Sequence, residues 1–148
     1  MTDPHIVRRS GAARQASIEE TAAALGIDEA FVSALVDGFY GRVRQDDLIG
    51  PIFDAAIGDA WDTHLPKMKD FWSSMALGTR RYAGRPMPAH LKLPGLGAAH
   101  FTRWLALFRE TLDEIAPNPA AHAFFLDRAA RIAHGFQVTI AQMRPEVL

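Results

Sequence analysis

The sequence predicts an all-α fold, and three observations support that prediction. Apolar side chains recur every three or four residues over most of the 148 positions, which is the spacing of one helix face. Residues that favour helix starts and helix ends flank these stretches. No stretch alternates apolar and polar residues for long enough to be a convincing strand. With 49% hydrophobic and 22% charged residues, the chain has the composition of a globular protein of one domain.

The first helix is expected to begin at Ser17, after a flexible N-terminal tail at residues 1–16. Ser17 and Glu20 match a capping box, in which each side chain accepts a hydrogen bond from the other residue's backbone N–H. The helix would end at Gly26, because glycine readily takes the left-handed conformation that follows a helix end. Residues 17–148 are then expected to form a single domain.

Asp28 is expected to cap a second, longer helix. The apolar face of that helix repeats every four residues, at Phe31, Leu35, Phe39 and Val43. Residues 46–58, which follow it, are expected to be a turn region. Gly50 and Pro51 interrupt the helical period there.

The next helical pattern covers residues 59–77. Its apolar side chains fall at Trp61, Leu65, Met68, Trp72 and Met75. Pro66 lies inside the pattern, so either the helix begins late or it is kinked at that residue. Residues 78–98 show no clean period and contain several prolines and glycines. A structureless loop of this length is unusual in a compact domain and is often functional.

Two further helices are expected in the C-terminal part of the chain. The first has apolar residues at Phe101, Trp104, Leu105, Phe108, Leu112 and Ile115. It ends before Pro117. Asn118 then caps the last helix, and Pro119 takes its first position, where a missing N–H does no harm. The buried face of the last helix is expected at Phe125, Ala129, Ile132, Phe136, Ile140 and Met143.

Residue types and motifs that the sequence lacks exclude several classes of protein. Without cysteine there is no disulfide, thiolate metal site, iron–sulfur cluster or covalently attached c-type haem. No apolar run approaches the roughly 18–20 residues of a membrane span. The protein is therefore expected to be cytoplasmic and to have no membrane partner. The sequence also lacks a nucleophile elbow, a phosphate loop and a His-Glu-x-x-His metal motif.

Residues 20–36 have the spacing of a helix-turn-helix, but their charge argues against DNA binding. A recognition helix needs Lys or Arg to contact phosphates and bases. Residues 17–37 instead carry five acidic side chains and no Lys or Arg. The sequence therefore predicts no nucleic-acid partner.

His90 differs from the other histidines because it lies in a stiff segment with prolines on both sides, at Pro86, Pro88 and Pro94. A stiff segment lowers the entropy lost when one imidazole is held in a fixed direction, which suits a metal ligand. A turn histidine that bonds to the backbone would have the same pattern. The residues alone leave both interpretations open.

Three hydrogen-bond donors fall on otherwise apolar helix faces, namely Tyr40, His64 and Trp104. In one interpretation they are amphipathic residues at the core edge, with their polar tips in water. In the other, three donors from three helices converge on one ligand, opposite a metal held by His90.

Several ordered motifs resemble the truncated haemoglobin family, and specifically its third group. The motifs are Phe39-Tyr40-Gly-Arg-Val-Arg, Leu48-Ile-Gly-Pro-Ile-Phe53, Trp61-x-x-His64, Phe71-Trp72, Met87-Pro-Ala-His90-Leu-x-Leu-Pro94 and Phe101-x-x-Trp104-Leu-x-Leu-Phe108. The resemblance extends from Ile27 to Met143. It implies a globin-like two-over-two helical sandwich, here with an extra N-terminal helix.

The resemblance also implies a haem b cofactor and a role for individual residues. His90 becomes the ligand of the haem iron, and Tyr40, His64 and Trp104 become the residues on the distal, ligand-binding side. Further cofactor-binding residues are expected at Phe53, Lys67, Met68, Phe71, Trp72, Arg80, Tyr82 and Leu93. Lys67 and the basic cluster of Arg80, Arg81, Arg85 and Lys92 either pair with the haem propionates or form a solvated basic surface.

The expected function is binding of dioxygen and other diatomic ligands at the haem iron, including oxygen transport. The hydroxyl of Tyr40 and the indole N–H of Trp104 would stabilise the ligand, while His64 is either a third donor or a gate. The alternative is a haem enzyme that detoxifies nitric oxide or peroxide. It would depend on an unidentified reductase, because the sequence contains no flavin or reductase domain. A haem-free helical domain is the third interpretation. The protein is expected to be a monomer or a weak homodimer.

Overall fold

The computed structural model describes residues 11–82 and 96–143, and it is all-helical over these ranges. The helices are α1 (Gly11–Leu25), α2 (Glu29–Gln45), α3 (Gly50–Ile57), α4 (Trp61–Leu77), α6 (Ala98–Ile115) and α7 (Pro119–Met143). The predicted all-α class is confirmed. None of the helices in these ranges is long and apolar enough to cross a membrane.

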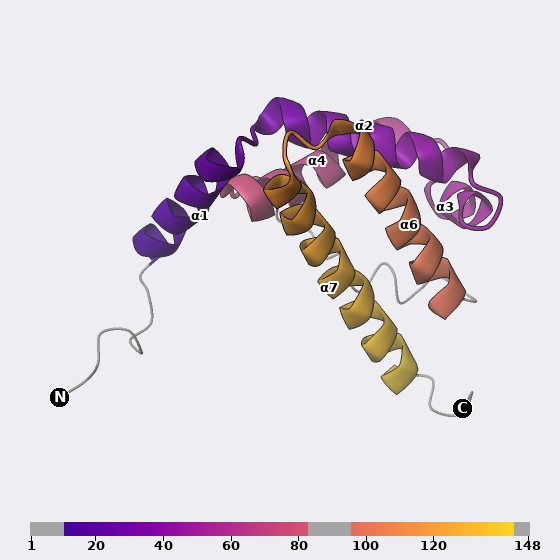
Figure 1. Ribbon diagram of the computed structural model, residues 1–148. Coiled ribbons are helices and arrows are strands. Elements are labelled where there is room, and N and C mark those ends of the chain that lie inside the picture. Colours follow the sequence, from indigo (N-terminus) through magenta and orange to yellow (C-terminus); the bar gives the residue numbers. More distant parts are fainter. Residues whose placement is uncertain (1–10, 83–95, 144–148) are drawn as a thin grey trace.

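The helices pack in two layers, as Figure 1 shows. One layer contains α2 and α4, and the other contains α6 and α7, which lie side by side and run in opposite directions. The layers meet where α2 crosses α6, while α1 and α3 lie at opposite ends of α2 (Figure 1). The expected two-over-two arrangement with an extra N-terminal helix is therefore confirmed.

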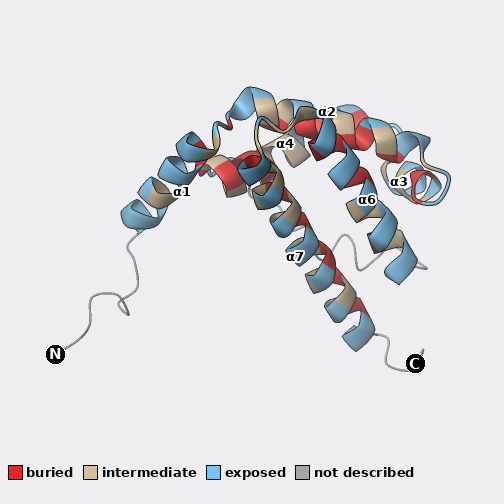
Figure 2. Ribbon diagram, viewed as in Figure 1, coloured by how far each residue is buried: buried red, intermediate tan, exposed pale blue. Residues whose placement is uncertain are grey.

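Helix α2 forms the centre of the hydrophobic core. Its buried residues are Val32, Leu35, Val36, Phe39, Tyr40 and Val43, in agreement with the four-residue period of the sequence. In Figure 2 the buried residues of α2, α6 and α7 lie along the faces where the helices meet, whereas α1 is mostly exposed. The core thus supports the middle of the bundle, and α1 contributes one buried side chain to it, Ala22.

Both predicted N-terminal caps are confirmed. The backbone N–H of Phe31 donates to Oδ1 of Asp28 over 2.8 Å, and the N–H of Ala121 donates to Oδ1 of Asn118 over 2.8 Å. Asn118 also donates from Nδ2 to the carbonyl of Leu25 over 2.9 Å. This bond joins the end of α1 to the start of α7, two segments far apart in the sequence.

The predicted N-terminal tail is too long by six residues, because α1 already begins at Gly11. Residues 12–16 are mostly alanine, arginine and glutamine, which are strong helix formers. Gln15 also anchors this turn, donating from Nε2 to the carbonyl of Gly78 over 2.6 Å. Ser17 therefore lies inside the helix, and the predicted capping box is wrong. Residues 1–10 lie outside the described residues.

The predicted turn at residues 46–58 contains a helix, α3. Oδ2 of Asp46 accepts hydrogen bonds from the backbone N–H groups of Leu48 and Ile49, over 3.0 and 2.9 Å, in the turn before this helix. Pro51 is in the first turn of α3, where a helix N–H would have no intrahelical partner. The Gly50-Pro51 pair therefore marks the start of a helix and does not break one.

The structure decides one of the two alternatives for Pro66, the late helix start. Helix α4 begins at Trp61, five residues before the proline, so the prediction of a late start is wrong. The helix ends at Gly78, which has a φ of 71° in the left-handed region that favours glycine.

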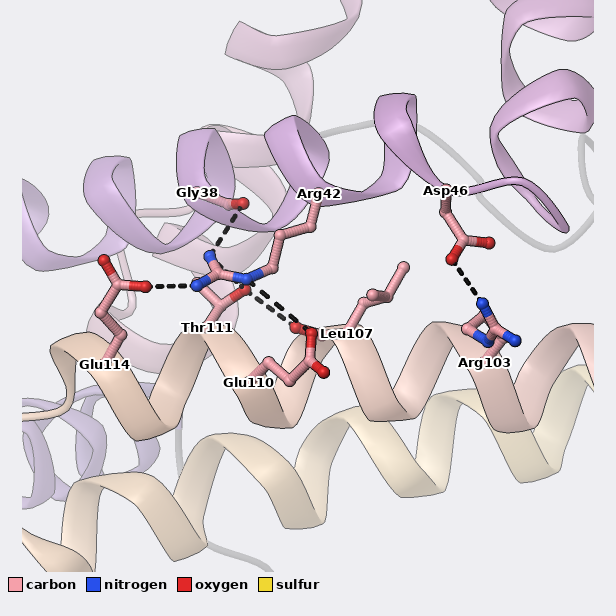
Figure 3. A network of polar contacts seen from close by, with 8 residues as sticks. All are labelled: Gly38, Arg42, Asp46, Arg103, Leu107, Glu110, Thr111 and Glu114. Atoms are coloured by element: carbon pink, nitrogen blue, oxygen red, sulfur yellow. Dashed lines mark hydrogen bonds and ion pairs between the residues drawn. The ribbon is translucent and has the colours of Figure 1, made fainter.

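A polar network ties the two layers together where α2 crosses α6 (Figure 3). The guanidinium of Arg42 on α2 pairs with Glu114 on α6 and donates to Oγ1 of Thr111 over 3.4 Å. Nearer the end of α2, Arg103 pairs with Asp46, with Nη1 and Oδ1 2.7 Å apart. These contacts hold α6 at a fixed position against α2, and with it the side chains that α6 presents.

Candidate functional site

The first part of the site is an aromatic cluster around Tyr40. The Tyr40 side chain is buried, at 6% exposed, and its ring lies edge-on to that of its neighbour Phe39 and to three rings from other helices. The centroid distances are 5.5 Å to His64, 5.8 Å to Trp61 and 5.9 Å to Phe53. These residues come from α2, α4 and the first turns of α3, so the cluster exists only because the three helices meet.

Burial keeps the hydroxyl of Tyr40 protonated. Removal from water disfavours the phenolate, and the phenolate of Tyr82 would disfavour it further, so the pKa of Tyr40 is raised far above its ordinary value. At neutral pH the side chain is therefore a hydrogen-bond donor inside an apolar environment.

His64 lies on α4 with its Nε2 atom buried and its ring edge-on to Trp61, 5.8 Å between centroids. Trp61 is fixed in turn, since its indole N–H donates to Oδ1 of Asp54 over 3.3 Å and the guanidinium of Arg44 lies over its ring at 4.6 Å. Met68, one turn after His64, is half-buried against the main core. The predicted distal residues Tyr40 and His64 are thus brought together.

Trp104 reaches the same region from the other layer. Its ring stacks on Phe108 at 5.7 Å and lies edge-on to Phe39 at 5.3 Å. Phe39 in turn contacts Tyr40, with 4.9 Å between ring centroids. Trp104 is therefore one aromatic ring away from the Tyr40 cluster.

The second part of the site is an apolar pocket between α3, α6 and α7. Its cavity volume is about 30 Å³, and it opens to solvent on one side. Its lining residues are Ile49, Ile52, Phe53, Leu96, His100, Phe101, Trp104, Ala133 and Phe136. Because Phe53 borders the Tyr40 cluster and Trp104 is close to it, the pocket and the cluster are adjacent parts of one site.

The remaining predicted cofactor-binding residues are more dispersed. Phe71 is half-buried and lies edge-on to Tyr82 at 5.2 Å, and burial raises the pKa of Tyr82 as well. Trp72 is only 3% exposed and stacks on Phe108 at 5.1 Å, so it lies in the core itself. Lys67 is exposed on α4 and forms no ion pair with another described residue. The predicted His90 and Leu93 lie outside the described residues.

Two arginines of the predicted basic cluster are engaged elsewhere. Arg80 donates from Nε to Oε1 of Gln15 on α1 over 3.2 Å. Arg81 pairs with Glu29 on α2 and, at 3.4 Å, with Asp70 on α4. Arg85 and Lys92 lie outside the described residues.

The described residues fit the haem group that the sequence resemblance implies. A flat, largely apolar ring with carboxylates at one edge needs apolar and aromatic walls and an open mouth, and the pocket has both. The ring of Tyr40 lies beside one wall, at Phe53, and His64 contacts Tyr40 in turn. The arrangement therefore suits a bound ring with a small polar ligand on one side.

Sequence reasoning missed several pocket residues. Phe101 and Phe136 were expected only as core positions, and Ile49 and Ile52 fall in the segment that was predicted to be a turn. His100 was not identified as a candidate from the sequence. The available signal was its place three residues after Gly97, where a side chain can accept a hydrogen bond from the residue before the helix.

Comparisons with known proteins agree with the fold and with the motifs. The family model described as bacterial-like globin matches residues 22–138. The group 3 truncated haemoglobin ctb of Campylobacter jejuni is 40% identical over 114 residues, covering 75% of this chain and 89% of the relative. The crystal structure of the group III truncated haemoglobin from Campylobacter jejuni is 38% identical, with a TM-score of 0.73. That structural match covers 77% of this chain and 91% of the other.

Proposed function

Because the chain belongs to the bacterial-like globin family, as a group 3 truncated haemoglobin, we propose that it holds haem b and binds dioxygen and other diatomic ligands. The observation that carries the proposal is the buried Tyr40, whose ring contacts both His64 and Phe53, a residue in the lining of the apolar pocket. A buried pair of donors beside an apolar wall is suited to a small polar ligand.

His90 is the proposed ligand of the iron. Cysteine is absent from the chain, and in globins a histidine is the usual protein ligand of haem iron. When bound, the haem supplies an iron with an open coordination position for a diatomic molecule. The second ring nitrogen of such a histidine normally donates to a carbonyl or carboxylate, which fixes the direction of the ring.

On the other side, the chain supplies the donors. An O–H or N–H donor close to a diatomic ligand that carries partial negative charge would stabilise that ligand and slow its release. Tyr40 is the strongest candidate, because burial keeps its hydroxyl protonated and excludes competing water. Trp104 is the second donor. His64 is either a third donor or a gate.

Further residues, of which Phe53 lines the described pocket, would orient the ring. Phe53, Met68, Phe71, Trp72, Tyr82 and Leu93 are the proposed apolar contacts. Lys67 is the proposed cation for a haem carboxylate, since it is exposed one turn from His64 and has no ion-pair partner among the described residues. Arg80 is a second candidate, which would have to exchange its contact with Gln15.

The first experiment is an absorption spectrum of the purified protein, ferric and ferrous, with and without carbon monoxide. We expect a histidine-ligated b-type spectrum and a clean carbon monoxide adduct. His90→Ala should remove the stable ferrous five-coordinate spectrum, because the iron then loses its protein ligand. An unchanged ferrous spectrum in His90→Ala would show that another residue holds the iron.

A haem enzyme that detoxifies nitric oxide or peroxide is the second candidate function. The same buried donors that hold dioxygen can polarise an O–O bond, so the cluster around Tyr40 favours it as well. This function needs a separate reductase as electron donor. Rapid catalytic formation of nitrate or of an oxidised product, with a physiological reductant, would distinguish the enzyme from a carrier. Oxygen transport, a cytoplasmic location and a monomeric or weakly dimeric state are proposed from the sequence alone.

A further inference from the structure

His100 is an ionisable residue in the lining of an otherwise apolar pocket. It is the third residue of α6, half-buried, and its eight companions in the lining are aliphatic or aromatic. A polar side chain in such a place loses hydration, and the free-energy cost is high unless a hydrogen-bond partner offsets it. One ring nitrogen, Nδ1, has a partner in the backbone of Gly97, and the other, Nε2, is left to bind a ligand.

The direction of the imidazole is fixed by the helix start. The backbone N–H of Gly97 donates to Nδ1 of His100 over 3.0 Å. An Nδ1 that accepts a hydrogen bond carries no proton, so the proton of the neutral ring is on Nε2. No described residue accepts a hydrogen bond from that Nε2–H. Because His100 is half-buried and its bond to Gly97 is exposed to solvent, we infer that the ring presents this donor where the pocket meets solvent.

The surroundings favour a negative group as the acceptor. His100 lies in the first turn of α6, the end of the helix that carries the positive partial charge. The neighbouring cation of α6, Arg103, is already paired with Asp46 at 2.7 Å. A carboxylate at the mouth of the pocket would thus find His100 as its donor, while the apolar lining would hold an apolar body attached to it.

We propose that Nε2 of His100 donates to a carboxylate of the bound haem, one of its two propionates. This inference rests on the proposed function and names the chemistry at the mouth of the same pocket. His100 thereby fixes which edge of the ring faces the solvent. It is a cofactor-binding residue that the sequence motifs do not identify.

The test measures the rate at which haem leaves the protein for an excess of apomyoglobin. Wild type is compared with three variants, each loaded with haem or with haem dimethyl ester, whose carboxylates are blocked. His100→Gln keeps both an acceptor for the Gly97 N–H and a donor. His100→Glu keeps the acceptor, suits the positive end of the helix, and places a negative charge at the rim. His100→Leu removes both functions.

With haem, we expect His100→Gln to stay close to wild type and His100→Leu to lose haem about tenfold faster. That change is typical of a lost hydrogen bond to a charged group. His100→Glu should be at least as fast as His100→Leu, because it repels the carboxylate. With the dimethyl ester, wild type and the three variants should agree within about twofold, since there is no carboxylate to bind.

Two results would overturn the proposal. Equal acceleration of haem and dimethyl ester loss in His100→Leu would show that the residue acts only through the helix start or through packing. Slow haem loss from His100→Glu would show that no carboxylate lies near the ring. Urea unfolding of the same variants reports the helix cap separately. Failure of the wild type to take up either compound would instead overturn the proposed function, and this inference with it.

Discussion

At the scale of single residues, the site depends on donors that the fold keeps out of water. Tyr40 is the clearest example, because its ring is enclosed by Phe39, Phe53, Trp61 and His64. Burial of a hydroxyl is unfavourable unless it gains a partner. Under the proposed function, the bound diatomic ligand is that partner.

Tyr40→Phe should raise the rate of dioxygen release, because it removes one buried donor and leaves the ring in place. A hydrogen bond of this kind contributes about 1 kcal/mol, so the release should be several-fold faster. Stopped-flow displacement by carbon monoxide measures the rate. A double-mutant cycle with Trp104→Phe then shows whether the two donors act on one ligand. Unchanged release in Tyr40→Phe would mean that its hydroxyl does not reach the ligand.

The same residue predicts how stability depends on alkaline pH. The folded state holds the proton of Tyr40 above the ordinary pKa of 10.0, so the unfolded state binds fewer protons there. The contribution of Tyr40 to the free energy of unfolding is therefore complete below about pH 10. It is lost as the pH rises above that value, by about 1.4 kcal/mol for each pH unit. Urea unfolding at about pH 8 and about pH 11 should show a larger loss in wild type than in Tyr40→Phe. Equal losses would contradict the burial of an un-ionised phenol.

At the scale of helices, the region between α2 and α4 determines the shape of the site. Helix α3 is short, yet it supplies Phe53 to the Tyr40 cluster. Ile49, the residue just before this helix, lines the pocket. Its start is set by the Asp46 carboxylate and by the close approach of Gly50 to the end of α2. Burial opposes the ionisation of Asp46, but the N–H groups of Ile49 and Leu48 and the guanidinium of Arg103 outweigh it and lower its pKa.

Gly50→Ala should destabilise the protein by about 1–3 kcal/mol, because the new methyl group has no room. A Cβ at this position would lie 2.9 Å from the carbonyl oxygen of Val43, which is backbone and cannot rotate away. Gly41→Ala is the matched control, since apart from its two chain neighbours and the backbone of its own helix, no described atom would lie within 4 Å of its Cβ. As an exposed helix position, it should gain up to about 1 kcal/mol. Urea denaturation measures both variants, and equal stability of the two would contradict the close approach.

At the scale of the whole molecule, the pocket lies between α3 and the layer of α6 and α7, and α1 contributes no residue to its lining. The site side chains come from α2, α3, α4, α6 and the last helix, α7. Helix α1 is fixed at a few points, through Ala22, the Gln15–Gly78 hydrogen bond and the bond from Asn118 to Leu25. It therefore adds to the stability of the bundle without entering the site.

Deletion of residues 1–25 should leave haem uptake intact and lower the free energy of unfolding. The loss should be about 1–3 kcal/mol, from one buried alanine and the three side-chain hydrogen bonds that join Gln15 to Gly78, Arg80 to Gln15 and Asn118 to Leu25. Absorbance titration with haem measures uptake, and urea unfolding measures stability. Loss of haem binding in the shortened chain would show that α1 supports the pocket, against the two-layer description.

Local signals in the sequence determined much of the fold. The apolar period of α2 and the caps at Asp28 and Asn118 depend only on residues within a few positions, and each was predicted correctly. The convergence of Tyr40 and His64 was one of two alternatives that the residues left open, and the family motifs favoured it. The role of His90 remains a prediction, because that residue lies outside the described ranges.

Only the tertiary structure decided the features that depend on contacts between distant segments. Helix α1 begins early because Gln15 reaches Gly78, and the pocket exists because α3, α6 and α7 meet beside Trp104. Hydrophobic period and caps describe one helix at a time, and they contain no information about which helices cross. His100 became a candidate for the same physical reason. Its bond to Gly97 depends only on neighbouring residues, but its place in the pocket depends on how α6 packs against distant segments.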